Sequence, residues 1–138
     1  MSKQSNEKLS DPDIRELFEK KNFAFLSSLM KDGSPHVPPT WVDIENGIIL
    51  INTALGRIKQ TNISRDPRVA LSIIDQNNQY EMITIRGKVR DQITGDAAEK
   101  HIDKSARKYI DMDKFPRRSK GERRVILKIK PEKIFHMK

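Results

Sequence analysis

The chain has 138 residues, of which 36% are hydrophobic and 33% are charged, so it can form a single domain with a substantial core. Its 27 basic and 19 acidic residues give a formal charge of +8, which favours anionic partners: nucleic acid, an acidic membrane surface, or a phosphorylated or carboxylated small molecule. The absence of cysteine excludes disulfides, thiolate metal sites and cysteine nucleophiles.

The N-terminal residues and the lengths of the apolar runs bear on where the protein resides. Residues 1–13, MSKQSNEKLSDPD, are polar and lack the apolar core of a signal peptide. No apolar run approaches the roughly eighteen residues that a membrane-spanning helix needs. We therefore expect a cytoplasmic protein that is not attached to a membrane, with a flexible N-terminus at residues 1–9 and a single domain at residues 10–138.

The first predicted element is a short amphipathic helix that ends at about Lys21. Ser10 or Asp11 can cap it, and Pro12 is tolerated in a first helical turn. Apolar residues then recur three and four positions apart, which is the spacing of one helix face. These residues are Ile14, Leu17 and Phe18.

Short strands are predicted to follow this helix. The apolar run at residues 23–30 leads into the hairpin signal Lys-Asp-Gly-Ser at residues 31–34. The second arm, residues 35–44, contains Pro38 and Pro39. Because proline cannot donate to a strand ladder, this arm is an edge, a bulge or a strand that enters a ligand site. The elements predicted next are a turn at 45–47, a strand at 48–51 and a short helix at 56–66.

The second half of the chain continues as strands around one further helix. Strands are predicted at residues 69–75, 80–93 and 124–129, with a charged loop at 111–122. The helix begins at Thr94 or Asp96, and its apolar stripe consists of Ala98, Ile102, Ala106, Tyr109 and Ile110. Several antiparallel strands at short spacing with few helices predict a mainly β fold, a small β-barrel, rather than a βαβ sheet.

A cluster of hydrogen-bond donors lies between two of the predicted strands. Thr53, Arg57, Lys59 and Asn62 follow one apolar run and precede another, and two of the four carry positive charge. At a strand-to-helix junction such a cluster suits a phosphate, because N–H groups at a helix start point outward. From charge alone, a solvated helix face is the alternative.

Other candidate residues have two interpretations each. Trp41, the only tryptophan, either packs in the core or lines a ligand groove. His36 is better explained by its backbone position than by catalytic chemistry. The basic loop at 114–124 is either solvated or contacts an acidic ligand or a partner chain. No nucleophile–base pair or metal-ligand spacing emerges, so the sequence names no catalytic residue and no metal site.

The order of these elements resembles that of the pyridoxamine 5′-phosphate oxidase-like split β-barrel family. The motifs that carry the resemblance are DGSPHVPPTW at residues 32–41 and GRIKQTNISRDPRV at residues 56–69. The stretches KYIDMDKFP and RRVILKIKPEKIF are similar to the short branch of flavin- and deazaflavin-dependent oxidoreductases. The resemblance covers almost the whole chain and implies an FMN-binding-like split β-barrel that forms a homodimer, with each cofactor in a groove between two barrels.

The resemblance also implies a set of cofactor-binding residues. The phosphate-holding lysine of the family matches Lys59, and the threonine that ends the preceding strand matches Thr53. Arg57 stands where serine is common, and Ile58 stands where the oxidases proper have arginine, which removes one expected phosphate ligand. The backbone around residues 36–40 matches the strand along the cofactor ring, where prolines leave unpaired carbonyls. The complete predicted set is Val37, Pro38, Thr40, Trp41, Thr53, Arg57, Ile58, Lys59 and Asn62.

The function that this resemblance implies is hydride transfer from the deazaflavin coenzyme F-420 to a small organic substrate. The acidic tail of that coenzyme suits the excess positive charge, and the cofactor itself would carry the chemistry. The alternatives are an FMN-binding oxidoreductase and a flavin- or deazaflavin-binding protein without turnover. A nucleic-acid-binding barrel is a remote alternative, because aromatic residues are only 6% and sit mostly at apolar positions.

Overall fold

The computed structural model describes residues 9–137, which form one curved antiparallel sheet with helices around it. The helices are α2 (Pro12–Glu19), α3 (Ile58–Arg65) and α4 (Asp96–Ile110). The strands are β1 (Ala24–Leu29), β2 (Pro35–His36), β3 (Pro39–Thr40), β4 (Asp43–Glu45), β5 (Ile48–Ala54), β6 (Arg68–Ile74), β7 (Met82–Thr94) and β8 (Arg124–Met137). The predicted mainly β fold is confirmed.

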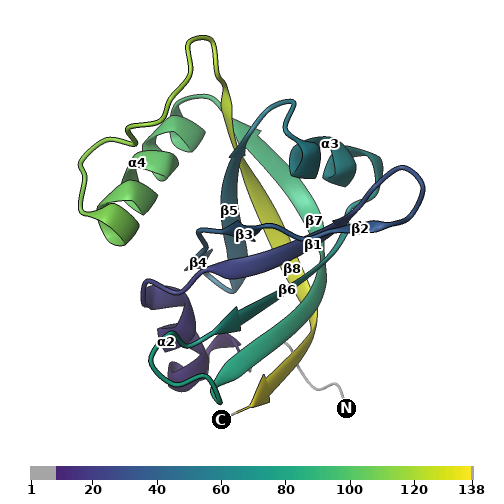
Figure 1. Cartoon of the computed structure of the whole chain (residues 1–138), viewed down its shortest axis with the longest axis vertical. Helices are drawn as coiled ribbons and strands as arrows, with labels where there is room; N and C mark the ends of the chain where they lie inside the picture. The colour runs from purple at the N-terminus through teal and green to yellow at the C-terminus, as the bar shows by residue number, and fades with distance from the viewer. Residues whose placement is uncertain (1–8, 138) are drawn as a thin grey trace.

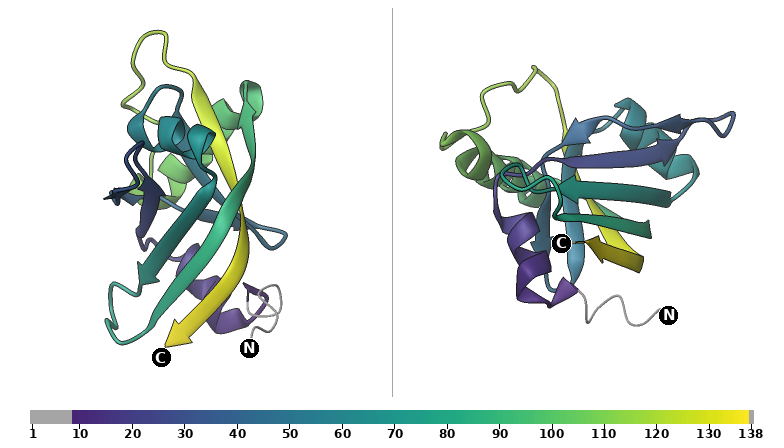
Figure 2. Two further views of the ribbon diagram at one scale, coloured as in Figure 1. Left: turned by 90° about the vertical axis from the view of Figure 1, so that its right-hand side faces the viewer. Right: turned by 60° about the horizontal axis from the view of Figure 1, so that its bottom comes forward.

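The eight-stranded sheet has the order β2-β1-β6-β7-β8-β5-β4, and β3 pairs separately with β1. Figures 1 and 2 show the sheet curling on itself, with α2 at one end and α3 and α4 at the other. This topology places β8, the last strand, between β7 and β5. The start of β8 therefore lies beside the end of β5, where the predicted donor cluster begins.

Strand periodicity builds the core. Successive side chains point to opposite faces of a strand, so every second residue of the long strands turns inward. The fully buried strand residues include Leu26, Ile49, Ile51, Ile73, Ile83, Ile85, Leu127 and Ile129. Burying each such side chain contributes about 1.5–3 kcal/mol, which makes this interior the main source of stability.

Helix α2 forms where the sequence predicts a short amphipathic helix, and it covers one end of the curved sheet. The Asp11 side chain caps the helix by accepting the Asp13 N–H at 2.9 Å, and Pro12 occupies the first turn. Its buried face consists of Ile14, Leu17 and Phe18. Leu9, which we assigned to the flexible N-terminus, is instead 2% exposed in the same core. Residues 1–8, the rest of that predicted segment, lie outside the described residues.

Two elements differ from the sequence prediction for physical reasons. Ile110 is 40% exposed rather than part of the apolar stripe of α4. Tyr109 takes the last buried position, the helix ends at Ile110, and its C-cap residue Asp111 has a left-handed conformation. Strand β8 continues past Pro131 to Met137, whereas we ended it at residue 129. The proline is accommodated because the β7–β8 register shifts beside it.

The described helices include none that is both long and apolar enough to cross a membrane.

We expect Gly87→Ala to destabilise the fold, because Gly87 lies at the β7–β8 register shift, where the strands approach closely. A β-carbon there would be 2.3 Å from the Lys130 carbonyl oxygen, a backbone atom that cannot rotate away. Chemical denaturation should show a loss of about 1–3 kcal/mol, as for other overpacked sites. Lys88→Ala, at the exposed neighbouring position, is the control and should change the free energy of unfolding by less than about 0.5 kcal/mol. A Gly87→Ala protein as stable as the wild type would contradict this account.

Candidate functional site

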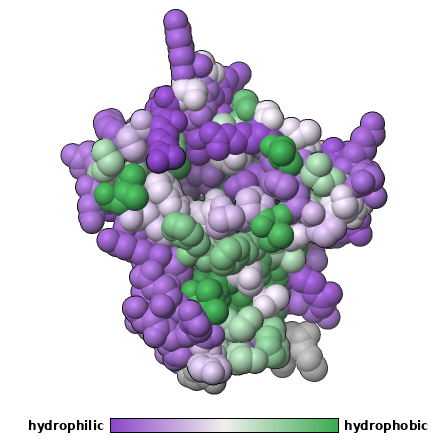
Figure 3. Space-filling view, viewed as in Figure 1, coloured by the Kyte–Doolittle hydropathy of each residue, from purple (hydrophilic) through white to green (hydrophobic). Residues whose placement is uncertain are grey.

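A cavity of about 400 Å³ opens beside the end of β5, the start of α3 and one face of α4. The residues that line it are Phe23, Pro39, Thr40, Trp41, Asn52, Thr53, Arg57, Lys59, Ile102, Ser105, Phe115, Arg117 and Arg124. Figure 3 shows the upper half of this face hollowed and surrounded by hydrophilic residues. Cationic and aromatic side chains therefore share one opening.

The turn from β5 into α3 brings the predicted donors to this cavity. Thr53 is 2% exposed near the end of β5, and Gly56 then turns the chain with a φ of +88°, which glycine adopts without strain. Arg57 is the N-cap residue of α3 and makes no side-chain capping bond. The first N–H groups of the helix are thus not capped by that side chain, and Lys59 lies in the first turn.

The cations at the cavity outnumber the carboxylates that neutralise them. Glu122 accepts hydrogen bonds from Arg124 at 2.8 Å and from Arg57 at 3.4 Å. Within the described residues, the Lys59 ammonium has neither a hydrogen bond nor an ion pair. Burial, together with the charges of Arg57 and Arg124, lowers the pKa of Lys59 to about 8. A bound anion would relieve this repulsion, so the electrostatics favour an anionic ligand.

Arg124 is the most buried of these cations, with 4% of its residue surface exposed. Its Nε donates to the Asn52 Oδ1 at 2.9 Å, and its guanidinium lies over the Phe115 ring, 5.1 Å from the centroid. Its backbone N–H donates to Glu99 at 2.9 Å. These contacts fix the guanidinium at the start of β8, where it lines the cavity.

Aromatic rings form another wall of the cavity. Trp41 stacks on Tyr109 with ring centroids 5.1 Å apart and planes 3° apart, and Phe115 meets Trp41 edge-on at 5.8 Å. The Tyr109 hydroxyl donates to the Asn22 carbonyl at 2.6 Å and accepts the Val42 N–H at 3.1 Å. Burial raises the pKa of Tyr109 to about 12, so the hydroxyl remains a donor. Trp41 is half-buried: it packs on the Tyr109 ring and also lines the cavity, and a contact between Trp41 and a cofactor stays a prediction.

The structure brings five of the nine predicted cofactor-binding residues together. Those that line the cavity are Thr40, Trp41, Thr53, Arg57 and Lys59. The other four do not line it. Val37 and Ile58 are 56% and 52% exposed, and the carbonyl of Pro38 accepts the Leu26 N–H at 3.2 Å. We had expected from the sequence that the Pro38 carbonyl would be unpaired, and this expectation was wrong.

Asn62 faces the interior of the protein rather than the cavity. Its Nδ2 donates to the Ser28 hydroxyl at 3.1 Å, and its Oδ1 accepts from Arg65 at 2.9 Å. It is 3% exposed and joins α3 to β1. Its amide is thus engaged by the fold itself, and a contact between Asn62 and a cofactor remains a prediction.

Several residues that line the cavity lie far in the sequence from the predicted donor cluster, and the sequence identified only some of them. The basic loop at 114–124 was identified as a candidate for ligand contact, and it supplies Arg117 and Arg124. No local pattern marked Asn52 or Ser105 as site residues. They reach the cavity only because α4 packs across β5 and β8.

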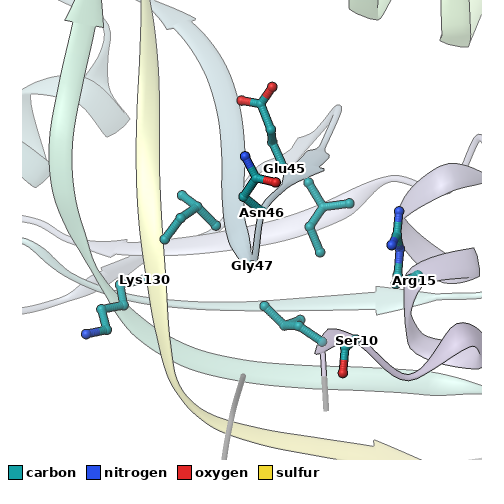
Figure 4. A pocket seen from close by; sticks show the side chains of 9 residues that line it. Ser10, Arg15, Glu45, Asn46, Gly47 and Lys130 are labelled. Carbon is teal, nitrogen blue, oxygen red and sulfur yellow. The ribbon is translucent and has the colours of Figure 1, made fainter. Parts of the chain in front are cut away.

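A second cavity, of about 670 Å³, lies between the start of α2, the β4–β5 turn and β8. Figure 4 shows its labelled polar side chains spread around the rim, with Arg15 and Lys130 on opposite sides. Arg15 is already paired with Glu19 at 3.2 Å. Although this cavity is larger, its polar groups do not converge, so we do not assign it as the functional site. The described residues also include no group of three or more His, Asp or Glu side chains that could hold a metal ion.

Comparison with known proteins adds a family and a set of similar folds. Residues 10–138 match the family model described as pyridoxamine 5′-phosphate oxidase. A solved structure described as an F420 reductase is 28% identical, with a TM-score of 0.77 over 88% of this chain and 94% of that one. No match is found among curated proteins.

Two further solved structures share the fold at lower identity. A conserved hypothetical protein from Mycobacterium tuberculosis is 18% identical, with a TM-score of 0.72 over 93% of this chain and 84% of its own. General Stress Protein 26 from Bacillus anthracis is 19% identical, with a TM-score of 0.64 over 91% of each chain. At this level of identity they show the fold alone.

We expect the affinity of this cavity for a small anion to fall as the pH rises above about 8. The pKa of Lys59 is about 8 in the free protein, and a bound anion raises it. The attraction is therefore complete below the free pKa, falls as the pH rises above it, and is lost once the pH passes the raised pKa of the complex. Sulfate, which stays fully ionised, is the probe, and calorimetric titration between about pH 6.5 and 9.5 measures its affinity.

Two variants separate Lys59 from other titrating groups. Lys59→Met should bind sulfate more weakly and lose this pH dependence. Lys108 also has a pKa of about 8, but its ammonium donates to the carbonyls of Phe18 and Val42. Lys108→Met should therefore keep the fall above pH 8. Sulfate affinity of the wild type that stays constant across the range would refute the assignment.

Proposed function

The chain belongs to the pyridoxamine 5′-phosphate oxidase family, and on that premise we propose that it is an oxidoreductase that uses coenzyme F-420. In this proposal it transfers a hydride to a small organic substrate. The observation that carries the proposal is that four cationic side chains and an aromatic wall line one cavity. One of the four, Lys59, has no partner among the described residues. A phosphate attached to a flat ring system matches both halves of that lining.

The residues present fit such a cofactor. Lys59, Arg57 and Arg124 supply positive charge for the phosphodiester, and the Thr53 hydroxyl adds a neutral donor at the end of β5. The side chains of Trp41 and Phe115 offer an apolar surface for a ring and keep water from it. When bound, reduced F-420 supplies the hydride, so the protein has to bind, orient and shield rather than provide an acid or a base.

Two observations favour the deazaflavin over FMN. Ile58 stands where the oxidases proper have arginine, and it is 52% exposed and does not line the cavity. The solved structure described as an F420 reductase is similar over nearly the full length of both chains. FMN is the alternative cofactor, and its terminal phosphate would contact the same cations. Direct binding experiments with each cofactor distinguish FMN from F-420.

We also propose that the protein acts as a homodimer. Across neighbouring strands the outward row of the sheet runs from Phe25 through Ser72 and Thr84 to Phe135. Phe25 is 41% exposed and Phe135 is 60% exposed. Figure 3 shows hydrophobic residues gathered over the middle of the face, where β1 lies in Figure 1. A sheet face that exposes two large aromatic side chains supports association of two copies.

We expect purified protein to bind F-420 and to oxidise its reduced form when a suitable electron-poor alkene is present. Replacing Lys59 with alanine should weaken F-420 binding by about 10- to 100-fold, the usual effect of losing one charged hydrogen bond. Fluorescence titration measures this, and parallel titration with FMN decides between the cofactors. Lys100→Ala, which removes an exposed lysine of α4, is the matched control.

Each outcome of this experiment has a definite meaning. Tight FMN binding without F-420 binding would replace the deazaflavin by FMN. Binding without oxidation of the reduced cofactor by any member of a broad alkene panel would indicate a carrier or sensor. If Lys59→Ala leaves the affinity for both cofactors unchanged, the proposed site is wrong.

We expect light scattering after size exclusion to give twice the 16.0 kDa mass of the chain. Phe135→Glu should shift the protein toward monomer, because it replaces one of the two exposed aromatic side chains of this row with a charge. Tyr80→Glu is the control, since Tyr80 lies in the β6–β7 turn and is 82% exposed. A monomeric wild type would exclude the dimer.

A further inference from the structure

A chain of hydrogen bonds runs from the cavity to a buried histidine that the proposed function does not use. Arg124 Nε donates to Asn52 Oδ1 at 2.9 Å. Asn52 Nδ2 lies 3.1 Å from His101 Nδ1, and His101 Nε2 lies 3.0 Å from Asp43 Oδ2. The four residues come from β8, β5, α4 and β4, so the contacts join four separate elements.

The direction of each bond in this chain is fixed by its neighbours. The Asn52 amide must present its oxygen to Arg124, which has only donors, and its Nδ2 to the Ala98 carbonyl at 2.9 Å. The same Nδ2 donates to His101 Nδ1, which must therefore be unprotonated. His101 consequently carries its proton on Nε2 and donates it to Asp43.

Asp43 remains a carboxylate in this arrangement. Burial alone would raise its pKa, but hydrogen bonds from His101 and the Ile44 N–H, with the charge of Lys104, hold the pKa well below its usual range. Lys104 donates to the same Oδ2 at 3.2 Å. The charged groups facing His101 are thus Asp43 from β4, Lys104 on its own helix and, through neutral Asn52, Arg124 from β8.

We propose that His101 orients Arg124 through Asn52, and that a second proton on His101 breaks the bond between Asn52 and Arg124 Nε, so that the guanidinium is no longer held in its orientation toward the cavity. With a proton on Nδ1, the histidine would face the Asn52 amide donor to donor. Rotating that amide by half a turn would satisfy His101, but it would place Nδ2 against Arg124 and Oδ1 against the Ala98 carbonyl. In both cases Asn52 no longer bonds to both His101 and Arg124. Arg124 Nε loses its acceptor, and the guanidinium keeps only the Glu122 carboxylate, which bonds to its other side.

This inference rests on the proposed function in one respect: Arg124 has to contact the cofactor phosphate for its loss of orientation to change affinity. His101 itself is 8% exposed and does not line the cavity. It is therefore a positioning residue, and its effect should appear in the pH dependence of binding.

The first test is the affinity for F-420 as the pH is lowered from about 7.5 to about 5, a range in which histidines take up a second proton. The phosphodiester of F-420 does not itself change charge there. Wild-type affinity should fall by about tenfold, the usual effect of losing one well-placed hydrogen bond to a charged group. His101→Gln presents an oxygen to Asn52 and an amide N–H to Asp43, so it mimics the singly protonated ring without titrating.

The variants give opposite expectations. His101→Gln should bind F-420 as the wild type does at the upper pH, and its affinity should stay constant as the pH falls. His101→Leu should bind weakly throughout, and circular dichroism shows whether it is folded. If His101→Gln keeps the wild-type fall at low pH, the inference is overturned.

The second test needs no cofactor. In nitrogen-15-labelled protein, the Arg124 Nε–H signal, assigned by its loss in Arg124→Lys, should broaden or move as the pH falls, and it should not do so in His101→Gln. If F-420 fails to bind the wild type but this signal responds as expected, the proposed function fails and the positioning role stands. An Arg124 signal with the same pH response in both proteins would overturn the positioning role even if F-420 binds.

Discussion

Arg124 cannot stay at the start of β8 unless its charge is satisfied, because a buried guanidinium without partners is strongly unfavourable. Three different groups meet that requirement: the Glu122 carboxylate, the Asn52 amide oxygen and the Phe115 ring. They come from the chain just before β8, from β5 and from the loop after α4. Satisfying this one cation therefore fixes the positions of the segments that enclose the cavity.

The sheet makes this arrangement possible. Thr53 pairs with Val125 and Ala54 with Arg124, so the register of β5 and β8 sets Arg124 directly beside the end of β5. The turn after β5 then carries Arg57 and Lys59 to the same place. The result is a cluster of cations held close by the backbone, with one carboxylate shared between two of them. Because these cations are held close together before any ligand binds, the site attracts anions more strongly than the same side chains would on a flexible loop.

The aromatic wall is fixed by equally specific bonds. Tyr109 ties α4 to the backbone at Asn22 and Val42, and Trp41 stacks on its ring. Because these contacts are all within the protein, they hold the ring of Trp41 without a ligand. The cationic half of the cavity is built on β5 and β8 and the aromatic half on α4, and the ring of Phe115 joins the two halves because it contacts both Trp41 and Arg124.

The sequence by itself determined the local elements and one half of the site. Alternating apolar residues specified the strands, the Asp11–Pro12 pair specified the start of α2, and the segment from Thr53 to Lys59 specified the cationic turn. These features depend on neighbours within a few residues, so a single sequence contains them. The course of β8 past Pro131 was missed because the register shift that accommodates the proline belongs to two strands at once.

Only the tertiary structure decided which polar groups meet. Asn62 has the residue type of a phosphate ligand, yet it bonds to Ser28, because the packing of α3 on β1 turns it inward. Asn52, His101 and Asp43 carry no local signal, since nothing within any one segment shows that the others will lie 3.0 to 3.1 Å away. The physical reason is that propensity and periodicity act along the chain, whereas hydrogen-bond partners across the fold depend on strand register and helix packing.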